Sequence, residues 1–560
     1  MVFFSILDRN KGGYFKINPL NNGLVSKQQY EADTNVLITT FSRRDEDVFS
    51  ITDFLPMTSE KNVYFSEIHR KIQTYADISV EIEFGPFKKE ERNRMEKFPG
   101  KGFMVYSGKT TQYLSTDIPL DIEDGIVRGV IDLPASHHRW LVTTYGLRGS
   151  YSVSSFLSEE RLWQTIKYWK RWLTRSSYRG MYHDLVNRSL LTLKGLFFDP
   201  TGFMVAAPTT SLPETIGGSR NWDYRFMWIR DTTYVIEAFL RLGYVEEARK
   251  FFSAIIDRFE RDGRLFSVYP ISDDSKIEET LVDLTGYMGS KPVRIGNGAY
   301  GQLQIDQCAS LVMGLRLLIE SNSTTSIHTI EKVYLVGEYL SKIWTEADSS
   351  IWEIRGEKRN YVYSKALTWK AFIDLSWLFS KMGANDLASK YAELADTVKN
   401  QIYSRGISKN AYFSQSYDSE EIDSSLLRLP LIGFCDFREA TYQRTLKEIE
   451  KRLMKEDFLF SRYTSRRSEL KGRDNAFLMI SFWYIRNLIG MGKLSRAYEG
   501  IIRIKSILND LGLMPEEIEF DTHRYLGNYP QALSHLSFIL TLIEYNSEME
   551  KIKTVFSKGY

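Results

Sequence analysis

The sequence predicts a multidomain β + α protein, in which an N-terminal antiparallel β-sandwich is followed by a mainly helical region. The first observation is a series of short β-branched and apolar runs up to residue 157, without helical patterns between them. The second is a change near residue 158 from a period of two to a helical period. The third is a set of about ten to twelve helical patterns between residues 180 and 548, enough to close a double ring of helices.

The N-terminal strands are predicted from alternation and from β-branched composition. Residues 78–84 alternate apolar and polar side chains, which is typical of a half-buried strand. Further strands are predicted at residues 35–41, 48–54, 102–106 and 126–133. Closely spaced strands without intervening helices favour a sandwich, and we place this domain at residues 1–157.

The helical part begins at Ser158, where Leu162, Ile166 and Trp169 follow at helical spacing. We expect a linker helix at residues 158–183 and a second, helical domain at residues 184–560. A helix–glycine–helix pattern recurs there at irregular separations, which favours αα-hairpins over a tandem repeat. Its glycines are Gly243, Gly383 and Gly492.

Composition excludes several classes of function. The 560 residues include 73 basic and 71 acidic side chains, and a net charge of +2 without a basic block argues against nucleic-acid and membrane-surface binding. No apolar run is long enough to span a membrane, and no signal peptide is visible. Cys308 and Cys435 lack zinc spacing, so we expect buried thiols and no metal. These features predict a soluble, cytoplasmic protein.

Aromatic residues make up 14% of the chain, which fits either a large aromatic core or a site where rings stack on sugars. Composition alone favours the core. Long loops on a helical scaffold are the places where function concentrates. Here they are rich in Gly, Pro, Trp, Tyr and charged residues, and they cover residues 199–230, 268–305, 351–365 and 509–530.

The first loop ends in Trp228, Arg230 and Asp231, directly before a predicted helix. An Arg–Asp pair beside a ring is suited to sugar hydroxyls, because one group donates and the other accepts hydrogen bonds. The alternative is a structural salt bridge that caps the next helix. The glycine-rich stretch 294–306 matches neither a dinucleotide nor a phosphate-binding fingerprint, and alone it favours a plain turn.

Two other loops each place a carboxylate beside apolar residues: Ile351–Gly356 contains Glu353, and Leu511–Glu519 contains Glu516. Burial against a ring keeps a carboxyl protonated, as a general acid requires, while an ionised carboxylate can activate water. Glycoside hydrolysis needs both. Any single Glu is more often a solvated surface charge. No Ser–His–Asp pattern, metal cluster or flavin motif competes, and we interpret His535 as structural.

These stretches resemble glycoside hydrolase family 15, which contains glucoamylases and the bacterial and archaeal trehalases. The matching strings are Pro-Thr-Thr-Ser-Leu-Pro-Glu, Gly-Gly-Ser-Arg-Asn-Trp-Asp-Tyr-Arg-Phe-Met-Trp-Ile-Arg-Asp, Arg-Ile-Gly-Asn-Gly-Ala-Tyr-Gly-Gln-Leu-Gln-Ile-Asp, Ile-Trp-Glu-Ile-Arg-Gly, Met-Pro-Glu-Glu-Ile and Leu-Gly-Asn-Tyr-Pro-Gln-Ala-Leu-Ser-His-Leu. They occur in the family's order across almost the whole chain. The resemblance implies an N-terminal β-sandwich followed by a catalytic (α/α)6 barrel.

The resemblance also implies roles for individual residues. Glu353 matches the family's general acid and Glu516 its general base, in an inverting reaction that needs roughly 6.5–9.5 Å between the carboxyls. Glu517 is not excluded as the base. Trp228, Arg230 and Asp231 match the group that grips the non-reducing glucose. The remaining residues assigned to substrate binding are Tyr300, Trp352, Arg355 and Glu517. Fungal glucoamylases carry a pocket Trp at the position of Tyr300.

Two departures from the family pattern stand out. Glu353 is followed by Ile354, where fungal glucoamylases have a second Glu, so a polar contact to the next sugar is missing. Trehalases and prokaryotic glucoamylases resemble the chain better. The sequence also begins where many relatives already have some thirty to forty residues, including early sandwich strands, so we expect either a naturally short form or a start that has been assigned too late. We therefore expect an exposed sheet edge if a strand is missing.

The expected activity is hydrolysis of trehalose to two glucose molecules by an α-glucoside hydrolase that needs no cofactor. The alternative is a glucoamylase that releases glucose from the non-reducing ends of maltooligosaccharides or glycogen. A phosphorylase would keep the acid and use bound phosphate in place of the base. The presence of Glu516 at the position of the base argues against a phosphorylase. A catalytically impaired sugar-binding homologue would bind glucose without turnover. The expected partner is the sugar substrate. Assembly into a homo-oligomer is compatible with the sequence.

Overall fold

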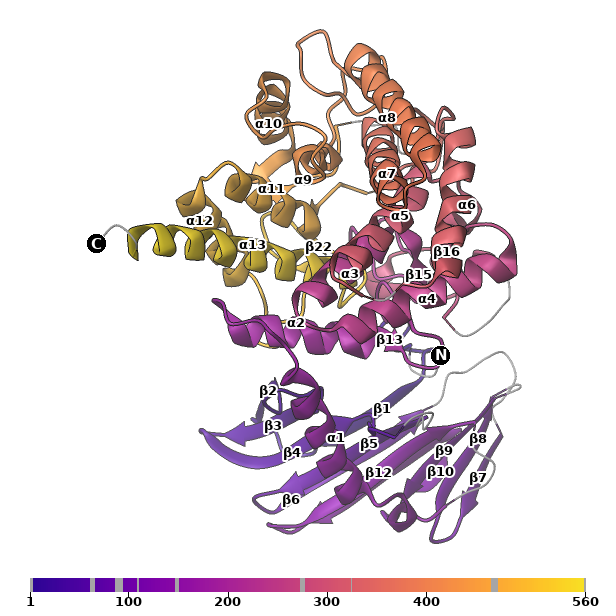
Figure 1. Cartoon of the computed structure of the whole chain (residues 1–560). Coiled ribbons are helices and arrows are strands. Elements are labelled where there is room, and N and C mark those ends of the chain that lie inside the picture. The colour runs from indigo at the N-terminus through magenta and orange to yellow at the C-terminus, as the bar shows by residue number, and fades with distance from the viewer. Residues whose placement is uncertain are drawn as a thin grey trace. The chain divides into compact units, whose positions relative to one another are not determined.

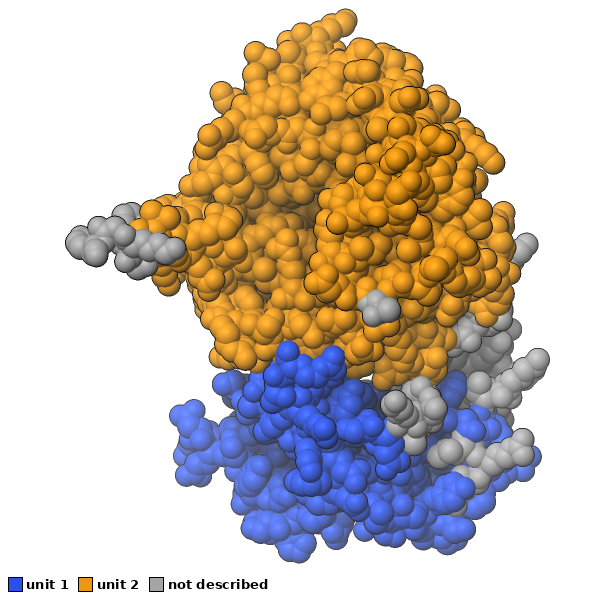
Figure 2. Space-filling view, in the orientation of Figure 1, with its two compact units in different colours: residues 1–175, 284–288, 509–512 blue, residues 176–283, 289–508, 513–560 orange. Residues whose placement is uncertain are grey.

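The computed structural model describes residues 4–60, 66–85, 94–107, 110–146, 151–271, 277–323, 325–464 and 472–557. The chain divides into two compact units, shown in different colours in Figure 2. Unit 1 contains Met1–Arg175, Leu284–Met288 and Asn509–Gly512, and unit 2 contains the other residues. Unit 1 carries the N-terminal sheets and unit 2 carries most of the helices (Figure 1).

Unit 1 is built from two antiparallel sheets (Figure 1). The smaller sheet contains, in spatial order, β1 (Tyr14–Pro19), β6 (Ile78–Gly85), β11 (Ile126–Leu133) and β10 (Asp121–Glu123). The larger sheet contains β2 (Val25–Tyr30), β3 (Leu37–Arg43), β4 (Glu46–Phe54), β5 (Glu67–Thr74), β12 (His138–Tyr145), β9 (Thr110–Thr116), β8 (Gly102–Ser107) and β7 (Arg94–Phe98).

The core of unit 1 lies between these sheets. Alternate residues of β6, from Ile78 to Phe84, are buried on one face, as the period of two predicts. They join one apolar cluster with Phe49, Ile72 and Leu141 of the larger sheet. The two sheets therefore pack face to face, and the predicted antiparallel sandwich is confirmed.

Helix α1 (Ser158–Leu173) begins at the predicted residue and belongs to unit 1. Hydrogen bonds attach it to the larger sheet: His69 Nδ1 lies 2.9 Å from Ser158 Oγ, and Lys71 Nζ lies 2.9 Å from a Glu159 carboxylate oxygen. The amphipathic helix thus covers part of the sheet surface.

Unit 2 is a double ring of helices. The inner helices are α3 (Thr232–Arg241), α5 (Ile305–Glu320), α7 (Val362–Lys381), α9 (Arg428–Leu431), α11 (Leu478–Gly490) and α13 (Ala532–Ser557). The outer helices are α2 (His183–Leu196), α4 (Val245–Asp262), α6 (Ile327–Ile343), α8 (Asn385–Arg405), α10 (Ala440–Leu453) and α12 (Leu494–Ser506).

Burial and contacts explain the ring. Helix α11 buries every residue from Leu478 to Ile489, whereas α12 buries only a stripe, as expected for inner and outer positions. Each inner helix contacts the next in chain order, and α13 contacts α3, so that the inner ring closes. The (α/α)6 barrel that the resemblance implied is confirmed.

Short strands connect the loops of unit 2. They are β13 (Phe197–Phe198) with β14 (Phe203–Met204), β15 (Met227–Trp228) with β16 (Val268–Tyr269), β17 (Thr280–Val282) with β18 (Val293–Ile295), β19 (Met454–Glu456) with β20 (Leu459–Phe460), and β21 (Ala476–Phe477) with β22 (Glu517–Ile518) and β23 (Tyr525–Leu526).

Candidate active site

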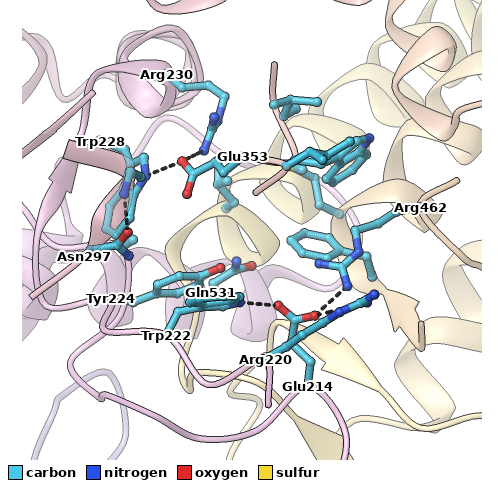
Figure 3. A pocket seen from close by; sticks show the side chains of 18 of the residues that line it. Glu214, Arg220, Trp222, Tyr224, Trp228, Arg230, Asn297, Glu353, Arg462 and Gln531 are labelled. Atoms are coloured by element: carbon cyan, nitrogen blue, oxygen red, sulfur yellow. Dashed lines mark hydrogen bonds and ion pairs between the residues drawn. The ribbon is translucent and has the colours of Figure 1, made fainter. Parts of the chain in front are cut away.

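A pocket lies in unit 2 where loops lead into the inner helices. It encloses about 970 Å³ of space, open solvent included. Charged and aromatic side chains converge on it in Figure 3. The lining residues fall within the segments 206–231, 297–302, 351–355, 462–463, 477–479 and 531–533, which lie before or at the start of α3, α5, α7, α11 and α13.

Most of the predicted site residues meet at this pocket. Those that line it are Trp228, Arg230, Asp231, Trp352, Glu353 and Arg355. Three others are not among its described lining residues: Tyr300, Glu516 and Glu517.

Glu353 is held at the pocket by two donors (Figure 3). Trp228 Nε1 donates to Glu353 Oε1 at 2.7 Å, and Arg230 Nη2 donates to the same oxygen at 2.9 Å. The other oxygen, Oε2, has no hydrogen-bond partner in the described part of the chain, and the side chain is 20% exposed. One oxygen is thus fixed while the other is free to contact a ligand.

The backbone at Glu353 is strained. Its φ of 51° lies in the left-handed region, as does the φ of 52° at Ser350. Such conformations cost roughly 1–3 kcal/mol per non-glycine residue and persist only when neighbouring contacts impose them. Here Glu353 N–H donates to Ser350 O at 3.2 Å, and Gln302 Nε2 donates to Glu353 O at 3.1 Å.

Arg230 pairs with Glu353 and not with the adjacent Asp231. Its Nη1 donates to Gln304 Oε1 at 2.9 Å, while Nη2 forms the ion pair with Glu353. Asp231 makes no side-chain hydrogen bond at the start of α3, so the helix-capping interpretation of the pair is wrong. Burial raises the pKa of Asp231 to about 7, against the opposing charge of Arg230.

Trp352 and Arg355, which lie on either side of Glu353 in the sequence, are each held by a carboxylate. Trp352 Nε1 donates to Asp423 Oδ1 at 2.9 Å. Arg355 donates two hydrogen bonds to Glu279, and its guanidinium lies 4.2 Å from the ring centre of Trp222, which also lines the pocket. The segment that carries Glu353 is therefore anchored at both ends.

Glu516 is fully buried and reaches the pocket through Tyr224. Tyr224, a lining residue, donates from Oη to Glu516 Oε1 at 2.5 Å, and Asn528 N–H donates to Oε2 at 3.1 Å. Burial and the nearby charge of Glu214 raise the pKa of Glu516 to about 8. Gly527 has a φ of 71°, and a Cβ on it would lie 2.3 Å from Glu516 Oε2, so the carboxylate packs directly against backbone.

Glu517 and Tyr300 occupy different surroundings. Glu517 lies on β22 with an oxygen 3.2 Å from Arg462 Nη2, and burial raises its pKa well above the ordinary value. The ring of Tyr300 stacks on Phe266, with centres 4.3 Å apart and planes 8° apart.

Sequence reasoning missed several residues that line the pocket. Glu214 accepts hydrogen bonds from Trp222 Nε1 at 2.7 Å and from Arg462 Nη2 at 2.5 Å (Figure 3). Glu214 and Trp222, like Tyr224, lie inside the motif strings, so their presence there was a usable signal. Arg462 lies outside every motif, and no feature of the sequence marks it.

His535 is structural, as predicted. Met514 N–H donates to His535 Nε2 at 3.1 Å, and Nδ1 lies 2.9 Å from Ser189 Oγ. Because Nε2 accepts, Nδ1 carries the proton and donates to the serine. Burial lowers the pKa of His535 to about 3, which keeps the ring neutral. Cys308 and Cys435 are buried free thiols, also as predicted.

Among the residues that the structure describes, no cluster of three or more His, Cys, Asp or Glu side chains is arranged to hold a metal ion. Within the same ranges, no helix has the length and apolar character needed to cross a membrane.

Comparison with known proteins places the chain in a family. The model of glycosyl hydrolases family 15 matches residues 180–542. A trehalase of Thermoplasma volcanium is 40% identical over 542 residues, covering 96% of this chain and 87% of the relative. A trehalase of Thermoplasma acidophilum is 39% identical over 542 residues, covering 96% and 93%. A crystal structure of a bacterial glucoamylase complexed with acarbose shares the fold, with a TM-score of 0.74 at 15% identity over 96% of this chain and 88% of that chain. The chain belongs to glycosyl hydrolases family 15.

Proposed function

We propose that this glycoside hydrolase cleaves trehalose with inversion, with Glu353 as general acid and Glu516 as general base. Glu353 gives its proton to the glycosidic oxygen while water attacks the anomeric carbon from the opposite face. Glu516 takes a proton from that water. The products are two glucose molecules, and the reaction needs no cofactor or metal.

The position of the Glu353 carboxyl carries the proposal. Its Oε1 is fixed by Trp228 and Arg230, whereas Oε2 faces the pocket without a described partner and is available to hold the transferred proton. Asp231 lies beside this group on the pocket wall and can accept hydrogen bonds from sugar hydroxyls. Acid and sugar-binding groups therefore converge on the same part of the pocket.

Glu516 suits the base better than Glu517 does. The Tyr224 hydroxyl and the Asn528 N–H both donate to Glu516, and both hydrogen bonds favour the ionised carboxylate. Glu517 instead pairs with Arg462 and has no described hydrogen-bond donor.

The trehalase relatives favour trehalose as the substrate, because they align with almost the whole chain. The likeness to a glucoamylase structure keeps α-1,4-glucans as the alternative. A cytoplasmic location agrees with a soluble disaccharide substrate and stays part of the proposal.

The test compares glucose release from trehalose and from maltotriose by the purified protein without phosphate. Release from trehalose supports the proposal, and release from maltotriose alone would replace it by a glucoamylase. Proton NMR of the first turnovers should show equal α- and β-glucose from trehalose, because only the attacked ring inverts. All-α product would contradict inversion.

The two carboxylates are tested by Glu353→Gln and Glu516→Gln. Each should lower kcat by about two to four orders of magnitude, since general acid–base catalysis contributes that much. Glu338→Gln serves as the control, because this carboxylate bonds to Lys390 and Tyr391 away from the pocket. Near-normal turnover in a folded Glu353 or Glu516 variant would remove that residue from its assigned role.

A further inference from the structure

A second charged group on the pocket wall repeats the pattern found around Glu353. Glu353 accepts from an indole N–H and from an arginine, and so does Glu214. In Figure 3 the Glu214 group and the Glu353 group occupy different sides of the pocket. The role proposed for Glu353 leaves the Glu214 group without a function.

The Glu214 group is a fixed array of charges. Burial alone would raise the pKa of Glu214, but Arg462 and Arg220 hold it below the ordinary value. Arg462 also binds Asp474, with Nε 2.7 Å from Oδ1, which fixes its guanidinium. Arg220 Nη1 is buried 3.5 Å from Asp474 Oδ1 without a described hydrogen-bond partner, so one donor remains unused.

This array has the chemistry of a sugar subsite. An ionised carboxylate accepts hydrogen bonds from hydroxyl groups, and guanidinium groups donate to them. Glu214, Arg220 and Arg462 all line the pocket, and the Trp222 ring beside them offers a flat apolar surface. A disaccharide carries two polyhydroxyl rings, and two separate charged groups on one pocket match that number.

We propose that Glu214 and Arg220, held in place by Arg462 and Trp222, bind the leaving glucose of the disaccharide. The inference rests on the proposed function, since it assumes that the first ring is held beside Glu353. Glu214 then replaces the polar contact that Ile354 cannot provide. Glu214 is a substrate-binding residue in this role and takes no part in proton transfer.

The competing role for Glu214 is to position the base. Gly527 N–H donates to Pro213 O at 2.9 Å, so the loop of Glu214 also contacts the backbone that supports Glu516. The two roles differ in which substrates they affect. A subsite for the leaving sugar matters only when the leaving group is a sugar, whereas misplacing the base slows hydrolysis of every substrate.

The test measures kcat/KM of Glu214→Gln and Arg220→Gln on the disaccharide that the wild type cleaves and on α-D-glucosyl fluoride, which has no leaving sugar. We expect a fall of roughly 10- to 100-fold on the disaccharide, as for loss of a hydrogen bond to a charged group. The fall on the fluoride should be several times smaller. Glu338→Gln should match the wild type on both substrates.

Four results would overturn the inference. An equal fall on both substrates would make Glu214 a positioning residue for the base, and no fall on either would remove it from the site. A fall confined to the fluoride would contradict a leaving-sugar subsite. If Glu214→Gln lowers the thermal midpoint strongly, Arg220→Gln alone decides the outcome. A wild type that cleaves α-D-glucosyl fluoride but no disaccharide would contradict both the subsite and the proposed substrate. A wild type that is inert on all substrates would contradict the proposed function itself.

Discussion

Replacing Asp306 by asparagine should remove part of the pH dependence of stability. Asp306 lies in the first turn of α5, is fully buried, and neither carboxyl oxygen has a described hydrogen-bond partner. Burial raises its pKa from 3.8 to about 7, although Arg230 opposes the shift. Folding therefore favours the protonated form of this carboxyl.

The direction and the size of this effect on the unfolding free energy follow from the difference between the folded and unfolded pKa of Asp306. A pKa raised on folding gives stability that is complete below the unfolded pKa and is lost as pH rises through the folded value. A shift of about 3 units at 1.36 kcal/mol per unit is worth about 4 kcal/mol. Asparagine cannot ionise. The unfolding free energy of Asp306→Asn, relative to the wild type, should thus increase by about 4 kcal/mol between pH 4 and pH 8.

Urea unfolding followed by tryptophan fluorescence at pH 4, 6 and 8 measures this difference. Other carboxylates titrate in both proteins, so most of their contribution cancels in the comparison. Glu246→Gln, at an exposed position on α4, provides the control and should track the wild type. A difference between Asp306→Asn and the wild type that stays constant across the range would refute the reasoning.

Two further predictions concern the support of Glu516. Tyr224→Phe should lower kcat roughly 10- to 100-fold, because it removes a hydrogen bond to a charged group. That bond lowers the pKa of Glu516, so the acid limb of the kcat/KM profile should move to higher pH, and an unmoved limb would disagree. Gly527→Ala should lower kcat and the thermal midpoint, since the left-handed backbone alone costs roughly 1–2 kcal/mol with a Cβ and the new methyl displaces Glu516. Unchanged kinetics in this variant would mean that the carboxylate position is uncritical.

The fold was largely predictable because its signals are local. The alternation in residues 78–84 and the change of period at Ser158 each depend on side chains within one element, and both agree with the structure. The contrast between the fully buried α11 and the amphipathic α12 is likewise visible in their own residues. The domain limits at residues 157 and 183 stay predictions.

The site was predictable only where a motif carried it. Trp228 and Arg230 meet Glu353 across more than 120 residues, which the family resemblance could imply and periodicity could not. The pairing of Arg230 was mistaken, because adjacency in sequence favoured Asp231. Arg462 was not predicted at all. Its contact with Glu214 spans 248 residues, and the sequence around an arginine outside a motif does not indicate its partners.

Under the role proposed for Glu353, its left-handed backbone conformation favours activity at the expense of stability. Glycine adopts this φ without the steric cost that glutamate bears, and asparagine tolerates it better than most residues. Random substitution that relaxed the loop would therefore tend to raise stability while deleting the carboxyl. In the role proposed for Glu353, the loop therefore keeps a carboxyl at a backbone conformation that glycine would adopt at a lower cost in stability.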